Sequence, residues 1–142
     1  MQKISAIMTR SVQVVQPHDT VQHAAQCMKD LDVGAIPVCD GRTLVGMITD
    51  RDITVRVSAR GLSPGTTTVM DVMSKELLWC IEDESATEVL DGMGEHQIRR
   101  LPVVNAHKEL VGIVSLGDLA TRQHTPVDQA LRDISTPAHE LR

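Results

Sequence analysis

The stretch LVGMITDRD at residues 44–52 decides the fold, because it returns in closely similar form as LVGIVSLGD at residues 110–118. In each stretch an apolar run leads directly into a hydroxyl residue and, three positions later, an aspartate. Apolar, β-branched runs of this length predict a strand, and Ser or Thr followed three residues later by an acidic residue is typical of a helix start. Both stretches therefore predict a strand that passes directly into a helix.

The two stretches belong to a longer internal repeat with an offset of about 65 residues. Ile7-Met8-Thr9 matches Val72-Met73-Ser74, and Ile36-Pro37-Val38 matches Leu101-Pro102-Val103. Each copy is about 55 residues long, and a unit of that size rarely buries enough surface to be stable alone. We therefore expect the two copies to pack on each other.

Apolar residues with helical spacing predict a helix over residues 20–31, and the same spacing returns after Ser85 in the second copy. Asp19 or Thr20 supplies the N-cap of the first helix, and Ser85 supplies that of the second. The first helix of each copy is therefore predicted by its periodicity and by its cap.

Each copy continues with a short apolar segment that contains a proline, and then with a turn, a strand and a second helix. Because proline has no N–H for a strand ladder, we expect these segments to lie at a sheet edge or to begin a strand. The expected ranges are 35–39 and 101–104 for the proline segments, 44–49 and 110–115 for the strands, and 50–59 and 116–123 for the second helices.

The order of elements in each copy is β-α-β-β-α, which makes the fold class α+β, with two repeats packed as a pseudo-two-fold pair. We place the first repeat at residues 1–62, the second at 63–123 and a C-terminal tail at 124–142. The tail has a helix start at Thr125 and Pro126, so we expect either a short helix or a frayed end there.

The composition disfavours several classes of function. The chain has 14 basic and 19 acidic residues, a net charge of −5, which disfavours a surface for the nucleic-acid backbone. Trp79 is the sole aromatic residue, so stacking platforms for bases are almost absent. No apolar run reaches membrane-spanning length, and the N-terminus lacks the pattern of a secretory signal. We therefore expect neither nucleic acid nor membrane as a partner.

The reactive side chains form no recognisable catalytic or metal motif. Cys27, Cys39 and Cys80 are odd in number and make no C-x-x-C pattern, which is typical of reduced thiols in a cytoplasmic protein. The six histidines show no zinc-ligand spacing, so we predict no metal site, with one assembled across the fold or a dimer as the alternative. No nucleophile–base pattern, P-loop or dinucleotide loop is present, and we expect no enzyme.

Two copies of β-α-β-β-α, each with an apolar-Pro-Val strand and a Gly-x-x-[Ser/Thr]-x-x-Asp segment, resemble a pair of cystathionine-β-synthase (CBS) domains, also called a Bateman module. The resemblance covers residues 4–123, and the chain is similar to standalone two-domain bacterial proteins, among them the mycobacterial hypoxic response proteins. It implies a regulatory module of tandem CBS domains without catalysis. It also implies that an adenine nucleotide (AMP, ADP or ATP) binds in the cleft between the repeats, and that the chain forms a homodimer.

The resemblance assigns the ribose of the nucleotide to Asp52 and Asp118, with Thr49 and Ser115 near the ribose and phosphate. The chemistry of these residues agrees, because a carboxylate can accept two hydrogen bonds from a ribose diol and a hydroxyl can share a phosphate oxygen. The alternative is a capping box, in which the same residue types close a helix start and need no ligand. Capping and binding are compatible with each other.

The resemblance also assigns phosphate contacts, since basic residues that match Arg99 and Arg100 often face ligand phosphates in the family. The guanidinium fork suits phosphate geometry, and Arg51 is a third candidate. The first copy has Gly34 in place of Arg99 and carries Asp50, which would repel phosphate, so we expect two unequal sites. The alternative for each arginine is a solvated charge or a weak surface ion pair.

The adenine pocket has no chemical signature in the sequence, because such pockets are lined by apolar side chains and backbone. The resemblance places it near one set of residues in each copy, for which ordinary core strands are the alternative. The candidates are Val14, Val15, Gln16, Ile36, Pro37 and Val38 in the first copy, and Trp79, Cys80, Ile81, Leu101, Pro102 and Val103 in the second.

The leading hypothesis is therefore a cytoplasmic energy or stress sensor that binds an adenine nucleotide and signals to a downstream protein that the sequence does not identify. One alternative is a ligand-free homodimer with a structural or partner-binding role. Another is a redox- or metal-responsive module that uses the thiols and histidines.

Overall fold

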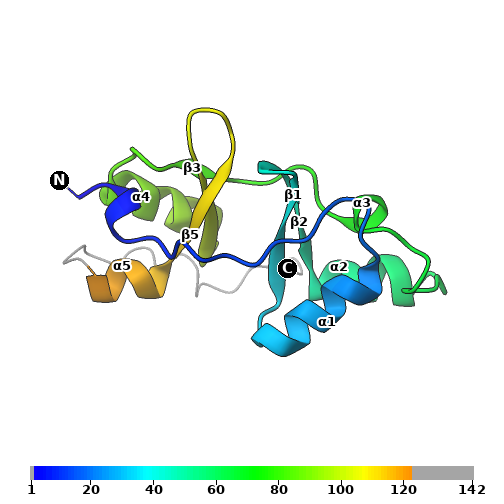
Figure 1. The fold of residues 1–142 in the computed structure, drawn as a ribbon. Coiled ribbons are helices and arrows are strands. Elements are labelled where there is room, and N and C mark those ends of the chain that lie inside the picture. Colours follow the sequence, from blue (N-terminus) through cyan, green and yellow to red (C-terminus); the bar gives the residue numbers. More distant parts are fainter. Residues whose placement is uncertain (1, 123–142) are drawn as a thin grey trace. The chain divides into compact units, whose positions relative to one another are not determined.

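Figure 1 shows the computed structural model, which describes residues 2–122 as two units. One unit consists of Gln13–Leu77 with His107–Leu110. Within the described residues, the other combines Leu78–Ala106 with residues 111–122 and with residues 2–12. The predicted tail helix falls outside the described residues.

The unit around the first repeat is built on a two-stranded antiparallel sheet of β1 (Ala35–Asp40) and β2 (Thr43–Thr49). The predicted first helix is confirmed as α1 (Val21–Leu31), and the Thr20 hydroxyl caps it by accepting the His23 N–H at 3.1 Å. After β2 the chain forms α2 (Asp50–Ile53), then a π-helix η2 (Thr54–Ser58), and later α3 (Val69–Val72).

The unit around the second repeat has a three-stranded sheet in the order β3-β4-β5. Its strands are β3 (Cys80–Ile81), β4 (Arg100–Val104) and β5 (Leu110–Ser115), and β3 runs parallel to β4. The helices are α4 (Ala86–His96), α5 (Leu116–Arg122) and the short 3₁₀ helix η1 (Ile4–Ala6). Ser85 caps α4 as predicted, by accepting the Glu88 N–H at 3.2 Å. The second repeat thus contains the predicted elements in the predicted order, whereas the strand predicted before the first helix of the first repeat is reduced to an isolated bridge between Val15 and Val38.

The units do not follow the two halves of the sequence, because each includes the lead-in segment that precedes the other repeat. Before the first repeat, η1 and the residues around it bond to the second: the Ile4 N–H donates to the Glu84 carbonyl, and Thr9 and Ile113 exchange backbone bonds at 2.8 and 2.9 Å. Before the second repeat, α3 lies against the first, where Met47 and Ser74 exchange bonds at 3.1 and 2.8 Å. The limits 1–62 and 63–123 for the two repeats stay a prediction. In the structure, the segment before each repeat packs with the other repeat.

A glycine in each repeat admits this exchanged segment. A Cβ atom on Gly46 would lie 2.8 Å from both the Met73 sulfur and the Ser74 carbonyl oxygen. A Cβ atom on Gly112 would lie 2.7 Å from the Met8 sulfur and from the Thr9 carbonyl oxygen. The backbone cannot approach so closely past any larger residue, which explains the glycine in both copies of the motif.

The expectation that the proline segments lie at a sheet edge or begin a strand is confirmed for β1, which is an edge strand because it belongs to a two-stranded sheet. It is wrong for β4, which is the central strand of its sheet and has Pro102 as its third residue. Pro37 faces Met47, whose N–H and carbonyl group both bond to Ser74 on the far side. Pro37 therefore needs no N–H toward β2. On the side away from β2, the Pro37 carbonyl accepts the Val15 N–H at 3.1 Å. The nitrogen of Pro37, which has no hydrogen to donate, lies just before the parallel bridge of Val38 with Val15 begins.

The second helix of the first repeat also differs from the prediction of one regular helix over 50–59. It begins as α2 and widens to η2, where the Ala59 N–H reaches back five residues to the Thr54 carbonyl at 2.9 Å. Three of the five η2 residues are β-branched, which weakens the preference for a regular α-helix.

Substitution of Gly46 by alanine should lower the free energy of unfolding by about 1–3 kcal/mol, the usual cost of forcing a methyl group into a filled space. Gly92, inside α4, provides a matched control, because a Cβ there meets nothing within 4 Å. Gly92→Ala should raise stability by up to about 1 kcal/mol through helix propensity. Urea unfolding followed by circular dichroism checks both, and equal effects of the two substitutions would contradict the close-approach argument.

Candidate functional site

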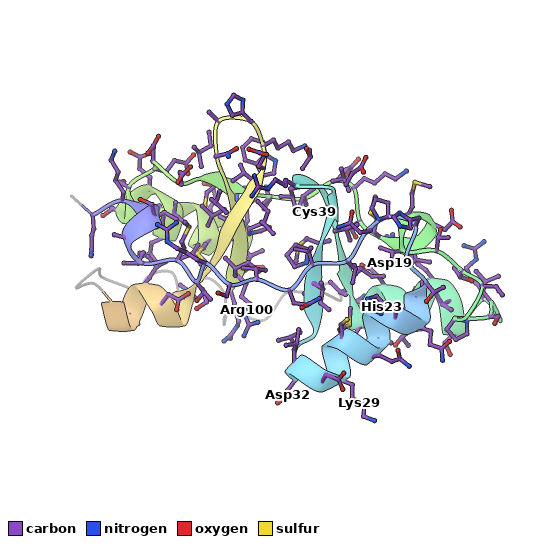
Figure 2. All side chains as sticks on the ribbon, in the orientation of Figure 1. Asp19, His23, Lys29, Asp32, Cys39 and Arg100 are labelled. Carbon is purple, nitrogen blue, oxygen red and sulfur yellow. The ribbon has the colours of Figure 1, made fainter. Side chains whose placement is uncertain are left out.

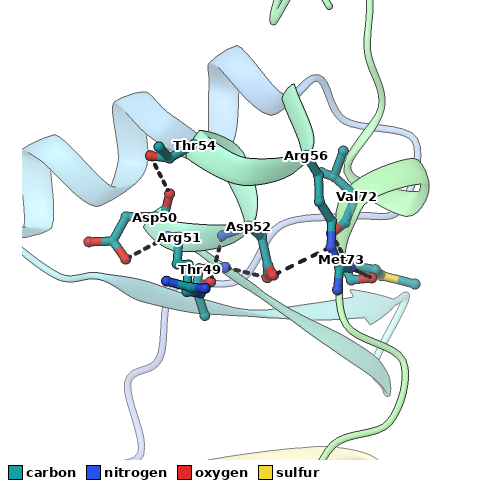
Figure 3. A network of polar contacts seen from close by, with 8 residues as sticks. All are labelled: Thr49, Asp50, Arg51, Asp52, Thr54, Arg56, Val72 and Met73. Carbon is teal, nitrogen blue, oxygen red and sulfur yellow. Dashed lines mark hydrogen bonds and ion pairs between the residues drawn. The ribbon is translucent and has the colours of Figure 1, made fainter. Parts of the chain in front are cut away.

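The junction between β2 and α2 holds the first predicted carboxylate in a reciprocal pair of hydrogen bonds (Figure 3). The Asp52 N–H donates to the Thr49 hydroxyl oxygen at 3.0 Å, and the Thr49 N–H donates to Asp52 Oδ2 at 3.0 Å. Asp52 is only 8% exposed. The carboxylate is therefore held by the backbone of the residue that ends the strand.

The junction between β5 and α5 repeats this geometry in the second unit. The Asp118 N–H donates to Ser115 Oγ at 3.1 Å, and the Ser115 N–H donates to Asp118 Oδ2 at 3.0 Å. The capping-box alternative is thus observed at both junctions. A carboxylate offers about four acceptor positions, so one capping bond does not preclude a bond to a ligand.

The surroundings of the two junctions differ in charge, as expected from the sequence. In the second unit the Leu116 N–H donates to the Arg99 carbonyl at 3.0 Å, which ties the backbone of Arg99 to the first residue of α5. Arg99 and Arg100 are exposed, and within residues 2–122 neither takes part in an ion pair. Figure 2 shows Arg100 at the outside of its unit. Two cationic side chains therefore project from this region.

In the first unit the matching place is acidic. The Asp50 N–H donates to the Gly34 carbonyl at 2.9 Å, and a Cβ atom on Gly34 would lie 3.1 Å from Asp50 Oδ2. An aspartate carboxylate thus stands beside the position that carries Arg99 in the other repeat. Arg51 is exposed, and its N–H donates to Asp50 Oδ1 at 2.8 Å. The structure supports the expected inequality of the two repeats in local charge.

Most of the predicted adenine-pocket residues of the first repeat pack into the core. Val15, Ile36 and Val38 are at most 1% exposed and belong to one hydrophobic cluster. Pro37 is also buried, while Val14 and Gln16 are half-buried, and Gln16 Oε1 accepts the Gly41 N–H at 3.0 Å. The core-strand alternative therefore describes the buried side chains, and their contact with a ligand stays a prediction.

In the second repeat a pocket of about 130 Å³ lies beside α4, which is smaller than the several hundred Å³ of a typical ligand site. Three predicted adenine residues line it, namely Trp79, Cys80 and Leu101. The other predicted residues, Ile81, Pro102 and Val103, are not part of its lining, and neither are Ser115 and Asp118. Its full lining is Leu78, Trp79, Cys80, Glu84, Glu88, Val89, Gly92, His96, Ile98 and Leu101.

Sequence reasoning missed the contribution of α4 to this pocket. Glu88, Gly92 and His96 recur every four residues and so share one face of the helix. Their spacing was visible in the sequence, but a mixed acidic, glycine and histidine stripe carries no motif. The structure shows that this stripe lines the same pocket as Trp79, which is 42% exposed.

Two of the three thiols are poorly suited to redox chemistry. Burial raises the pKa of the Cys39 thiol to about 11, and burial together with the nearby Glu84 carboxylate raises the pKa of Cys80 to about 12. The thiolate is the reactive form of cysteine, so both side chains stay protonated and inert near neutral pH. Cys27 is partly exposed and remains the accessible thiol of the three.

Among residues 2–122, no three His, Cys, Asp or Glu side chains come close enough together to hold a metal ion. No helix in this range combines the length and the apolar character needed to cross a membrane.

Comparison with known proteins identifies close relatives over nearly the whole chain. The family model described as CBS domain matches twice, at residues 4–59 and 69–125. The CBS domain-containing protein YhcV of Bacillus subtilis (strain 168) is 45% identical over 137 residues, which cover 95% of this chain and 96% of that protein.

Two solved structures connect the fold to ligands of other proteins. The crystal structure of Hypoxic Response Protein I (HRPI) with two coordinated zinc ions has a TM-score of 0.77 and 39% identity, and the match covers 87% of this chain and all (100%) of that one. The crystal structure of CBSX2 in complex with AMP has a TM-score of 0.75 and 25% identity, and the match covers 86% of this chain and 96% of that one. The predicted fold and the predicted likeness to hypoxic response proteins are both confirmed.

Alkylation should distinguish the three thiols. With iodoacetamide at pH 8, Cys27 should react first, while Cys39 and Cys80 should stay protected in the folded protein, because their raised pKa values leave little thiolate and their burial limits access. Peptide mass spectrometry measures the three rates, and protection should disappear in denaturant. Equal rates in the native protein would contradict this account of the thiols.

Proposed function

The chain belongs to the CBS domain family as a CBS-pair regulatory module, and we propose that it binds an adenine nucleotide through the two strand-to-helix junctions described above. The ligand is AMP, ADP or ATP, with ribose at Asp52 and Asp118 and with Thr49 and Ser115 beside it. The module works without catalysis of its own.

The observation that carries the proposal is the same reciprocal cap at both junctions. Each cap fixes one aspartate carboxylate through a backbone N–H at 3.0 Å. A carboxylate fixed before the ligand arrives loses little freedom on binding, which favours affinity. Two acceptor positions on one carboxylate can accept charge-assisted hydrogen bonds from both hydroxyls of a vicinal diol. The capping role therefore supports ligand binding as well as the helix.

The relatives support an adenine nucleotide in particular. CBSX2 was crystallised in complex with AMP, and the match covers 86% of the present chain. The exposed Trp79 and the buried Leu101 both line the pocket of the second repeat and give it an apolar surface, as an adenine ring requires. The pocket is small, so we assign it only to the base.

The phosphate is assigned to the second repeat. Arg99 and Arg100 are exposed there, and their guanidinium groups have no ion-pair partner in the described part of the chain. In the first repeat the Asp50 carboxylate lies beside the matching position. Like charges repel, so a phosphate-bearing ligand prefers the second repeat.

As a regulator, the module would respond through different affinities of the ligand for two arrangements of the protein. We place it in the cytoplasm as a homodimer that reports energy or stress to a downstream protein. A ligand-free homodimer with a structural or partner-binding role is the rival hypothesis.

A ligand screen tests the proposal directly. AMP, ADP or ATP at 100 times its dissociation constant should stabilise the fold by about 2.7 kcal/mol, which a thermal-shift assay detects easily. If none of the three shifts the melting temperature and calorimetry shows no heat of binding, the protein is not an adenine-nucleotide sensor.

Asp118→Asn should weaken nucleotide binding about 10-fold or more, because it replaces a charged acceptor of hydrogen bonds by a neutral one. The matched control is Asp91→Asn on the exposed side of α4, which changes the net charge equally. Titration calorimetry compares the two variants. If Asp118→Asn binds the nucleotide with wild-type affinity, the assignment of the ribose to Asp118 is wrong.

The phosphate assignment predicts a charge-dependent preference for AMP over adenosine. Arg99→Gln and Arg100→Gln should each reduce that preference several-fold, since a hydrogen bond to a charged group contributes about 1.5–3 kcal/mol. Arg60→Gln, at an exposed turn, is the control. Calorimetry at two salt concentrations gives the ratio of the affinities for AMP and adenosine. If this ratio is unchanged in both variants, the two arginines do not contact the phosphate.

One observation favours a second candidate, a metal-responsive module: the matched HRPI structure contains two coordinated zinc ions. Elemental analysis of the purified protein, together with a thermal-shift arm that contains zinc chloride, separates this candidate from nucleotide binding.

A further inference from the structure

Arg56 contacts two parts of the first repeat at once (Figure 3). Its Nη1 group donates to the carbonyl oxygens of Val72 at 3.0 Å and Met73 at 3.3 Å. Its Nε atom lies 4.0 Å from Asp52 Oδ1. One guanidinium group therefore lies between the end of α3 and the carboxylate assigned to ribose.

The carbonyl contacts fix the guanidinium in place. Val72 is the last residue of α3 and Met73 is its C-cap, and carbonyls at a helix end lack partners within the helix. They lie 16 and 17 residues along the chain from Arg56, so the bonds are tertiary. A surface ion pair alone would contribute little, but here the cation is already held by two carbonyl oxygens.

The Asp52 carboxylate consequently has a neighbour at each of its oxygens. Oδ2 accepts the Thr49 N–H, and Oδ1 faces the Arg56 guanidinium. Among the residues that the structure describes, Arg56 is the only cation within 4.0 Å of this carboxylate. With the side chain of Asp52 about 10% exposed, only part of the carboxylate is open to a ligand, and these two neighbours flank it.

We propose that Arg56 is a positioning residue: held by the carbonyl oxygens of Val72 and Met73, it sets the orientation in which Asp52 meets the two hydroxyls of a ribose. The inference rests on the proposed function and extends it to a residue that no sequence motif marked. Without Arg56 the carboxylate keeps its charge and its cap, but Oδ1 loses the cation that it faces, so only Oδ2 is held. It then binds ribose with less selectivity for the intact diol.

The second repeat has arginine at the same sequence position, since Arg122 follows Asp118 by four residues as Arg56 follows Asp52. The experiment must therefore isolate the first repeat. We use the Asp118→Asn chain as the background, so that any remaining selectivity for ribose comes from Asp52.

The measurement is the ratio of the dissociation constants of 2′-deoxy-AMP and AMP, obtained by titration calorimetry. In the Asp118→Asn background the ratio should be about tenfold, as expected for the loss of a charge-assisted hydrogen bond. Adding Arg56→Gln should bring it to within about threefold of unity, whereas the control Arg60→Gln should leave it unchanged. A residue that only stabilised the fold would weaken both ligands equally and leave the ratio intact.

If Arg56→Gln does not fold at the assay temperature, the ratio is measured on Arg56→Lys. That variant keeps a cation near the helix end, but an ammonium group lacks the planar fork that reaches both carbonyls and Asp52. It should also lower the ratio.

An unchanged ratio in the folded Arg56 variant overturns the inference, and so does an Asp118→Asn chain that binds neither nucleotide or does not distinguish them. In these cases the proposed function survives, provided that the wild-type chain binds AMP at the second repeat. Failure of the wild-type chain to bind any adenine nucleotide overturns both.

Discussion

The constraint on which the structure depends is the close passage of backbone against backbone at two glycines. A Cβ atom on Gly46 would lie 2.8 Å from the Ser74 carbonyl oxygen, and one on Gly112 would lie 2.7 Å from that of Thr9. These contacts let the strand before each junction bond to the lead-in of the other repeat. The lead-ins in turn supply core residues, since Ile4 and Ile7 are fully buried in one cluster and Val69 and Val72 in the other. A larger residue in place of either glycine would displace both the lead-in bonded to the strand and the core residues that this lead-in supplies.

The junctions follow from this frame. Each strand ends at a hydroxyl residue whose backbone position is set by the sheet, and the hydroxyl and the aspartate then close on each other. Two carboxylates are thereby presented in the same way by two copies of the same local structure. The differences between the copies lie in the charges around them, with Asp50 at one and Arg99 at the other. One scaffold therefore places the same capped carboxylate in two different charge environments.

Much of this could be predicted from the sequence, because repeat, periodicity and caps are local signals. The helix starts at Thr20 and Ser85 and the strands before Asp52 and Asp118 are of this kind. The edge position expected for the second proline segment was wrong, because the place of β4 in its sheet depends on strand pairing between residues far apart in the chain. The contacts of Arg56 with Val72 and Met73 and the pocket beside α4 were missed for the same reason. Each depends on residues far apart in the chain, which no local pattern records.

The exchange of lead-ins has a consequence for how such a chain can arise. A single copy of the repeat carries a lead-in that fits the sheet of another copy, so two identical short chains could complete each other by swapping that segment. Joining the two copies in one polypeptide keeps every one of these bonds and turns an association between molecules into a contact within one. Cutting the chain between its halves would reverse the process: each fragment would keep the segment that belongs to its neighbour and would reassemble only when both are present.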